Sequence, residues 1–132
     1  MRAVDIMNER SGIIKNIIRE NYNNKDFNIE MLAQWINLST SYCRDIICRD
    51  FGMPPQHLIE TFRLEKAIDL IQNGNKIYKI AVKVGYGSYH SFRFAFKKRV
   101  GISPHKFKES LDNQLNDSDE LINDTKKKLW IS

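Results

Sequence analysis

One short pattern of residues occurs twice in this chain, about 48 positions apart. In each copy an apolar residue next to an alanine comes first, a serine and an arginine follow, and a glycine and a proline close the pattern. Such repetition means that one supersecondary unit is built twice, so the chain folds as two related halves. The paired residues are Leu32 and Ile80, Ala33 and Ala81, Ile36 and Val84, Ser39 and Ser88, Cys43 and Phe92, Arg44 and Arg93, Ile47 and Phe96, Gly52 and Gly101, and Pro55 and Pro104.

Each copy predicts a short helix, a tight turn and a longer capped helix. Ala33 and Ala81 are small, as they must be if the following helix crosses close to them. Asn37 and Gly85 stand at the turns, where a residue that tolerates a positive φ is needed. The unit is therefore predicted to be a helix-turn-helix. Its helices are expected over 29–36 and about 40–51 in the first copy, and over 76–84 and 88–100 in the second.

The rest of the chain predicts further helices, and no segment alternates with the period of two that strands show. Ser11 is expected to cap a first helix, and Pro54 and Pro55 suit the first turn of a long one. We therefore expect an all-α chain of about seven helices, with two helix-turn-helix subdomains joined by a linker helix. Its parts are an N-terminal extension (1–10), the first subdomain (11–53), the linker helix (54–73), the second subdomain (74–108) and an acidic tail (109–132).

The positive charge of the chain is confined to its middle. Residues 1–38 carry five basic and five acidic side chains, residues 39–108 carry thirteen and five (net +8), and residues 109–132 carry three and six (net −3). A basic surplus that coincides with the repeated unit is typical of a nucleic-acid partner, although a solvated basic surface has the same composition.

Several other classes of protein are disfavoured. No apolar run approaches the ~18 residues of a membrane span, and the N-terminus lacks the pattern of a secretory signal. Cys43 and Cys48 do not form a CxxC pair and the three histidines are scattered, so we expect no disulfide, metal, cofactor or enzymatic activity. The chain is expected in the cytoplasm.

The outer faces of the two longer helices hold the candidates for reading bases. If Cys43, Ile47, Phe92 and Phe96 point inward, helical geometry leaves a set of mostly polar side chains outside. An arginine fork can pair with the O6 and N7 atoms of guanine, so the two arginines lead the set, with a phosphate contact or a surface ion pair as the alternative. The predicted base contacts are Ser41, Arg44, Asp45, Tyr89, His90, Arg93 and Phe94.

Three of these candidates leave an alternative open. Asp45 can accept a hydrogen bond from cytosine N4 or can hold Arg44. Phe94 can contact a thymine methyl group, or points inward if the helix phase is shifted by one position. His90 contacts the DNA or is simply solvated.

A second set of residues is predicted to contact phosphates. Basic side chains continue past the second longer helix, and such contacts fix the register on DNA without specifying sequence. The predicted phosphate contacts are Thr40, Ser88, Lys97, Lys98, Arg99, Lys106 and Lys108.

The second copy carries a family resemblance. IAVKVGYGSYHSFRFAFKKRVGISPHKFK resembles the signature of the AraC/XylS family of bacterial transcription regulators, with its isoleucine-alanine pair, glycine-aromatic turn, F-x-x-x-F-K pair and G-x-S-P close. LAQWINLSTSYCRDIICRDFGMPP and FRLEKAIDLI resemble the family's first helix-turn-helix and linker helix. The resemblance covers about residues 11–108.

The resemblance implies a DNA-binding unit with two recognition helices that enter successive major grooves of an asymmetric promoter site. It also implies a nucleoid-associated activator that contacts RNA polymerase, with no small-molecule effector bound by this chain. Asp45 and Phe94 stand where the family often has arginine, so two frequent DNA contacts are missing. These departures motivate an alternative, an interaction module or antagonist that keeps the fold but does not read DNA.

The acidic tail lies outside the resemblance. Its composition favours a flexible extension over most of its length. The alternative is an added helix with an apolar face, and Trp130 docked on the body of the protein. That face would hold Leu111, Leu115, Leu121 and Ile122.

Overall fold

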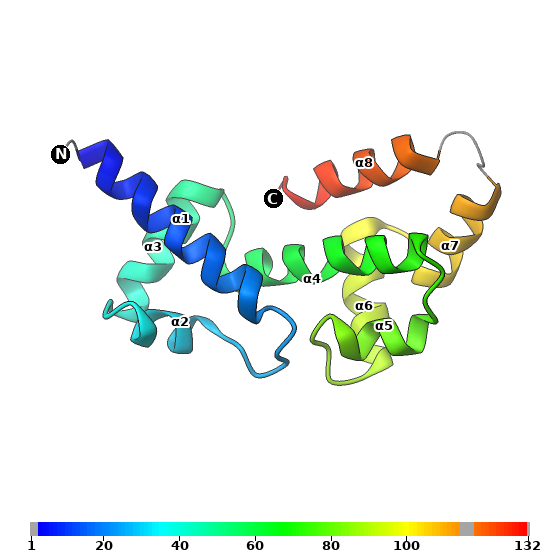
Figure 1. Cartoon of the computed structure of the whole chain (residues 1–132), viewed down its shortest axis with the longest axis horizontal. Coiled ribbons are helices and arrows are strands. Elements are labelled where there is room, and N and C mark those ends of the chain that lie inside the picture. The colour runs from blue at the N-terminus through cyan, green and yellow to red at the C-terminus, as the bar shows by residue number, and fades with distance from the viewer. Residues whose placement is uncertain (1–2, 114–117, 132) are drawn as a thin grey trace.

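The computed structural model describes residues 3–113 and 118–131, and within these ranges the chain is entirely helical (Figure 1). The predicted all-α class is confirmed, with eight helices described where about seven were expected. The helices are α1 (Ala3–Asn21), α2 (Ile29–Trp35), α3 (Thr40–Phe51), α4 (Pro55–Gln72), α5 (Ile77–Lys83), α6 (Tyr89–Val100), α7 (Pro104–Asn113) and α8 (Ser118–Leu129).

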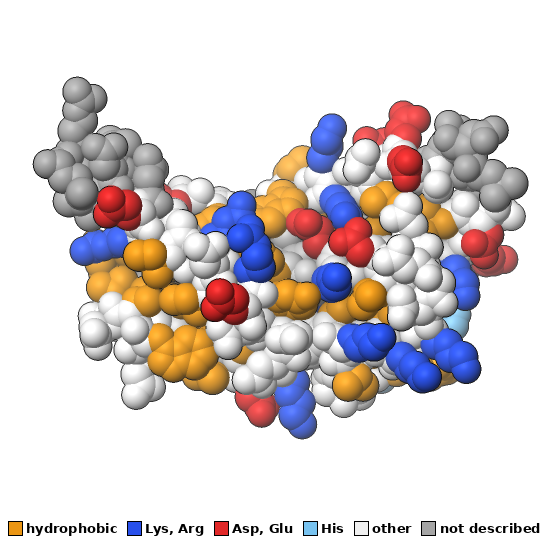
Figure 2. Space-filling model, viewed as in Figure 1, with side chains coloured by type: hydrophobic (Ala, Val, Ile, Leu, Met, Phe, Trp, Pro, Cys, Tyr) orange, Lys and Arg blue, Asp and Glu red, His pale blue; other side chains and the backbone are white. Residues whose placement is uncertain are grey.

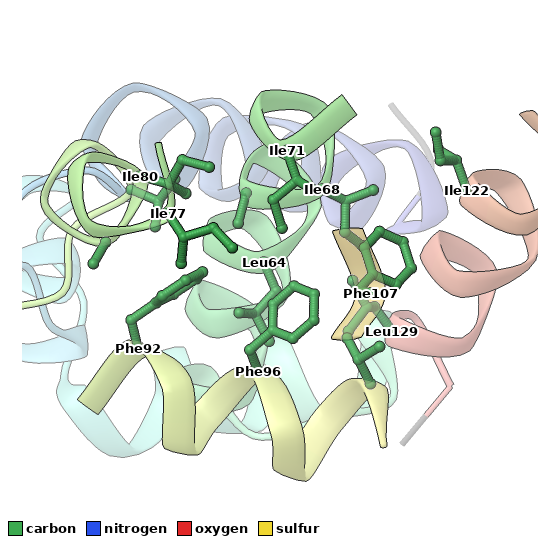
Figure 3. Packing of buried hydrophobic residues seen from close by; sticks show 14 of the residues in the cluster. Leu64, Ile68, Ile71, Ile77, Ile80, Phe92, Phe96, Phe107, Ile122 and Leu129 are labelled. Atoms are coloured by element: carbon green, nitrogen blue, oxygen red, sulfur yellow. The ribbon is translucent and has the colours of Figure 1, made fainter. Parts of the chain in front are cut away.

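The long helix α4 joins two helical groups. In Figure 1, α1, α2 and α3 gather at one end of α4, while α5, α6 and α7 gather at the other. Each group has its own hydrophobic cluster, and α4 contributes to both, with Leu58 and Ile59 in the first and Leu64 and Ile68 in the second. Figure 3 shows the second cluster, where Phe92 and other side chains of α6 point toward α4. The burial of apolar surface holds each group of helices on α4.

The repeated residues build the same local structure twice. Ser39 accepts a hydrogen bond from the backbone of Tyr42 (3.1 Å), and Ser88 accepts one from the backbone of Ser91 (3.1 Å), so each serine caps its helix. Gly52 (φ 72°) and Gly101 (φ 103°) end these helices in the left-handed conformation. The local structures expected from the repeat are therefore present in both copies.

The turns also behave as expected. Asn37 has a φ of 57° and Gly85 a φ of 100°. Ala33 and Ala81 are buried, which lets the longer helix of each unit approach closely. Both units are thus helix-turn-helix structures.

A polar joint connects the two groups next to α4. The guanidinium of Arg63 donates to the carbonyl oxygens of Tyr22 (2.7 Å) and Asn24 (3.0 Å), in the loop after α1. Gly85, in the turn of the second unit, lies so close that an added Cβ would be 2.4 Å from the oxygen of Tyr22. The ring of Tyr86 lies 5.5 Å from Arg63, and burial raises the pKa of its phenol. The second unit therefore contacts the first directly as well as through α4.

The N-terminal boundary differs from the expectation. Helix α1 begins at Ala3, so most of the expected extension (1–10) is helical and Ser11 lies inside the helix. The hydroxyl of Ser11 donates to the carboxylate of Asp50 in α3 instead of capping. A serine followed by apolar residues resembles a cap, but here its partner comes from another helix.

The expectation of a flexible tail is wrong for residues 118–131. Helix α7 continues to Asn113, and α8 packs against the body of the protein. Ile122, Thr125 and Leu129 are buried, because their spacing of three and four residues places them on one side of the helix. The acidic residues lie outside this face, so composition alone was misleading. Leu115, a candidate for the added helix, lies outside the described residues.

Candidate nucleic-acid interface

The outer face of α3 carries the predicted candidates of the first unit. Cys43 and Ile47 are fully buried, which confirms the predicted phase of the helix. Ser41, Arg44 and Asp45 are exposed. No ion pair joins Arg44 to Asp45 among the described residues, so the expectation that Asp45 holds Arg44 is not met in this structure.

The outer face of α6 is the matching surface of the second unit. His90, Arg93 and Phe94 are exposed, and Phe94 shows 66% of its surface to solvent. The alternative in which Phe94 points inward is therefore wrong. Together with Lys97, these side chains line a shallow depression on the surface, which also includes Lys98 and Gly101.

Electrostatics separates the two faces. The outer side of α6 carries Arg93, Lys97 and Lys98 and no acidic residue. On α3, Arg49 donates to Asp50 (3.0 Å), and this bond together with the one from Ser11 lowers the pKa of the Asp50 carboxyl. The α6 face thus presents a positive field to an anionic partner, whereas the α3 face is close to neutral.

Arg99 does not belong to this interface, so the prediction of a phosphate contact is wrong. Its side chain is 7% exposed and donates to Glu60 (2.8 Å), to the hydroxyl of Thr61 (2.8 Å) and to the carbonyl of Leu129 (2.8 Å). The run of three basic residues suggested that all of them face solvent. Arg99 lies seven residues after Phe92, however, and therefore falls on the same, buried side of the helix.

Two further candidates are engaged in local structure. The hydroxyl of Ser88 caps α6 and hydrogen-bonds to the hydroxyl of Ser91 (2.9 Å). The half-buried ring of Tyr89 packs against that of Tyr78 at a tilt of 36°, with the ring centres 4.3 Å apart, and lies 6.0 Å from the ring of His105. Tyr89 therefore belongs to an aromatic cluster beside the outer face of α6.

The remaining phosphate candidates are accessible. Lys97, Lys98 and Lys106 are exposed, while Thr40 and Lys108 are half-buried.

The structure adds basic residues that sequence reasoning missed. Lys and Arg side chains gather over α5 and its surroundings in the second unit (Figure 2). Lys76, Lys79 and Lys83 of this region are exposed. Their spacing along a short helix was a usable signal, because positions three and four residues apart share one helical face.

No helix within the described ranges is long and apolar enough to cross a membrane.

Comparison with known proteins agrees with this arrangement. The family model of a helix-turn-helix domain matches residues 32–110. The chain is 32% identical over 104 residues to the raffinose operon transcriptional regulatory protein RafR of Pediococcus pentosaceus, a match that covers 78% of this chain and 37% of RafR. The chain thus corresponds to only 37% of the length of that relative.

Two solved structures are similar to the fold. The C-terminal domain of the two-component response regulator yesN from Fusobacterium nucleatum has a TM-score of 0.73 and 32% identity, over 76% of this chain and 98% of that one. The C-terminal domain of AraT, a response regulator from Geobacillus stearothermophilus, has a TM-score of 0.71 and 32% identity, over 74% and 81%. With its two helix-turn-helix units, this chain therefore belongs to the AraC/XylS family of DNA-binding transcription regulators.

Proposed function

We propose that the chain reads an asymmetric site on double-stranded DNA by inserting α3 and α6 into successive major grooves. The observation that carries this proposal is the exposure of both outer faces on helices grouped at opposite ends of α4. The 18 residues of α4 give a rod of about 27 Å. Successive grooves on one face of a duplex lie ~34 Å apart, a distance of the same order as the length of this rod.

The second unit contributes most of the specificity in this proposal. Arg93 and His90 lie together on an outer face without acidic residues, where an arginine can form a bidentate contact with guanine. Arg44 has the equivalent position in the first unit, beside the carboxylate of Asp45. Because that carboxylate opposes the approach of phosphates, we expect α3 to contribute less affinity than α6.

Phosphate contacts surround this readout. We propose that they come from the exposed lysines beside α6 and from the half-buried Lys108, which neutralise the DNA backbone and make binding sensitive to salt. The proposed contacts are Lys97, Lys98, Lys106 and Lys108, with Lys76, Lys79 and Lys83 around α5.

Transcriptional activation through RNA polymerase, in the bacterial cytoplasm, is the regulatory role that we propose. Its support is membership of a family of transcription regulators. The test is transcription in vitro from a promoter that carries the selected site, with purified polymerase. Increased transcript supports activation, whereas decreased transcript shows repression.

Selection from a random duplex pool, followed by footprinting, tests the DNA readout. We expect one motif and a footprint over two adjacent major grooves. Arg93→Ala is expected to reduce discrimination at one base position about 5- to 150-fold, equivalent to ~1–3 kcal/mol. Arg19→Ala is the matched control, because Arg19 is an exposed arginine on α1, outside both recognition helices.

The nearly neutral outer face of α3 favours one competing function, an interaction module or antagonist that does not read sequence. Salt-sensitive binding without a recoverable motif, equally affected by the Arg93 and Arg19 variants, would support that function and contradict the proposal.

A further inference from the structure

We propose that residues 118–131 form a brace that fixes the two helix-turn-helix units relative to each other, and thereby sets the spacing between the half-sites that the chain accepts. This inference rests on the proposed two-groove readout. The segment lies entirely outside residues 32–110, which match the helix-turn-helix family model. The family model therefore does not explain this segment.

The brace joins both hydrophobic clusters within a few residues. Ile122 and Leu129 are buried in the cluster of the second unit, where Figure 3 shows them at the end of the core near Phe107. The next residue, Trp130, packs instead against the cluster of the first unit. Its ring lies 5.5 Å from that of Phe62, in an edge-on arrangement. Since one short segment contributes to both clusters, a rotation of one unit against the other must disturb its packing.

Polar contacts fix the same end of the brace. The carbonyl oxygen of Leu129 accepts from Arg99 of the recognition helix α6 (2.8 Å) and from Thr61 of α4 (3.2 Å). The indole N–H of Trp130 donates to Glu65 of α4. These groups are at least partly buried, so their hydrogen bonds are costly to break. The C-terminus of α8 is thus tied to the recognition helix and the linker helix at once.

The contact also extends to the first helix of the chain. The ammonium group of Lys15, on α1, lies 5.6 Å from the centre of the Trp130 ring, within the range of a cation–π interaction. Near the C-terminal end of α8, the brace therefore contacts α6, α4 and α1. Arg63 and Gly85 join the units at a separate place, and two separate joints restrict bending and twisting more than one does.

Fixing the units has a direct consequence for DNA binding. When one recognition helix is bound, the second binds as an intramolecular event, and its effective concentration is highest when the two helices already match the distance between their half-sites. One inserted base pair moves a half-site by ~3.4 Å and rotates it by about 34°. A rigid pair of helices penalises that change, whereas a loose pair adapts to it.

The first test measures binding to duplexes in which the two half-sites are separated by one base pair more or fewer. We expect the unaltered chain to lose about tenfold in affinity on each change, and Trp130→Ala to lose about threefold, because looser units adapt. Trp130→Phe keeps an aromatic ring beside Phe62 but lacks the bond to Glu65, and should be intermediate. Trp35→Ala is the control, since Trp35 is a half-exposed tryptophan that stacks on Phe27 in the first unit.

The second test requires no DNA. Cys48 is exposed on α3, whereas Cys43 is fully buried, so a spin label attaches at Cys48, with a second at Val82→Cys on the exposed side of α5. Pulsed electron resonance then gives the distribution of distances between the units. We expect a narrow distribution that broadens with Trp130→Ala and, to a smaller extent, with Trp130→Phe, in samples whose far-UV circular dichroism shows intact helices.

An unchanged width and an unchanged spacing preference in both Trp130 variants would overturn the brace. A chain without a two-groove footprint would overturn the proposed function instead, and the distance distribution would still decide on the brace.

Discussion

The first helix-turn-helix unit and the second close their recognition helices in the same way, yet equivalent positions carry different chemistry. Gly52 and Gly101 are both left-handed, and Ser39 and Ser88 both cap. On the outer surface, however, Asp45 of the first unit is replaced by a phenylalanine in the second, and Cys48 by a lysine. The caps and the closing glycines, which the fold needs, are repeated, whereas the outward positions are repeated at Arg44 and Arg93 but differ at these two.

The interiors differ as well. The first unit packs Cys43 and Ile47 inward, whereas the second packs Phe92 and Phe96, whose rings lie 5.7 Å apart. Phe96 also lies 5.7 Å from Phe107 of α7. Aromatic side chains remove more apolar surface from water. The second unit therefore has the larger hydrophobic core. The polar joint and the brace connect this unit to the rest of the chain.

The largest effect is expected at the turn of the second unit. Gly85→Ala would place a Cβ 2.4 Å from the carbonyl oxygen of Tyr22, at a φ of 100°. We expect it to lower the free energy of unfolding by about 3–4 kcal/mol, because strain and a backbone clash combine. Urea denaturation measures the change.

Two substitutions test the origin of that loss. Gly74 has a similar φ of 85° but nothing near its missing Cβ, so Gly74→Ala should cost only about 1 kcal/mol of strain. Asn37→Ala, at the equivalent turn of the first unit, should be similarly mild. Equal losses at Gly74 and Gly85 would contradict the close approach of the second unit to the first.

The next effect concerns Asp50 of α3 and Arg99 of α6, which occupy equivalent positions in the two units. Arg99→Ala leaves the Glu60 carboxylate without its partner and removes the bonds to the Thr61 hydroxyl and the Leu129 carbonyl, and should cost about 3 kcal/mol of unfolding free energy. Asp50→Ala removes only a surface pair with Arg49 and the bond from Ser11, and should change stability little. Thermal or urea unfolding of both variants checks this order, and a larger loss at Asp50 would contradict it.

The sequence predicted local features of the molecule better than contacts between distant parts of the chain. The repeat positions were enough to predict the caps, the turns and the inward faces, because each of these has a local residue requirement. The phase then placed Arg44, His90 and Arg93 outside. What failed depends on contacts far apart in the chain: Arg99 is buried by α4 and α8, and Ser11 bonds across to α3.

The prediction of a flexible tail failed for a related reason. Its acidic residues predict a solvated segment, but the buried face of α8 becomes recognisable only when α4 and α6 are there to receive it. The local signals were the apolar positions Leu121 and Ile122, together with Trp130 as a large aromatic residue near the end of a polar stretch.

A smaller effect is expected from a substitution of Lys97, whose equivalent in the first unit is Cys48. Lys97→Ala should reduce the slope of log affinity against log salt by about 0.9, the value for one phosphate contact on B-DNA. Cys48→Ala should leave the slope unchanged, since a cysteine offers no basic group to a phosphate. Binding isotherms at several salt concentrations measure both. A change in sequence preference with Lys97→Ala, at an unchanged slope, would show a base contact instead.

The smallest expected effect is at Asp45, and its direction decides the role of the first recognition helix. Asp45 is exposed, and no ion pair holds it among the residues described. If its carboxylate only repels phosphates, Asp45→Asn should raise affinity about two- to threefold for every duplex, most at low salt. If it accepts from cytosine N4, the same change should weaken binding at one base pair only. Phe94→Asn introduces the same residue at the equivalent position of α6. It removes no charge and should leave the salt dependence of binding unaltered. Because Asp45→Asn keeps the side-chain shape and removes the charge, its effect on a panel of single-base-pair variants separates a helix that reads DNA from one that merely accompanies α6.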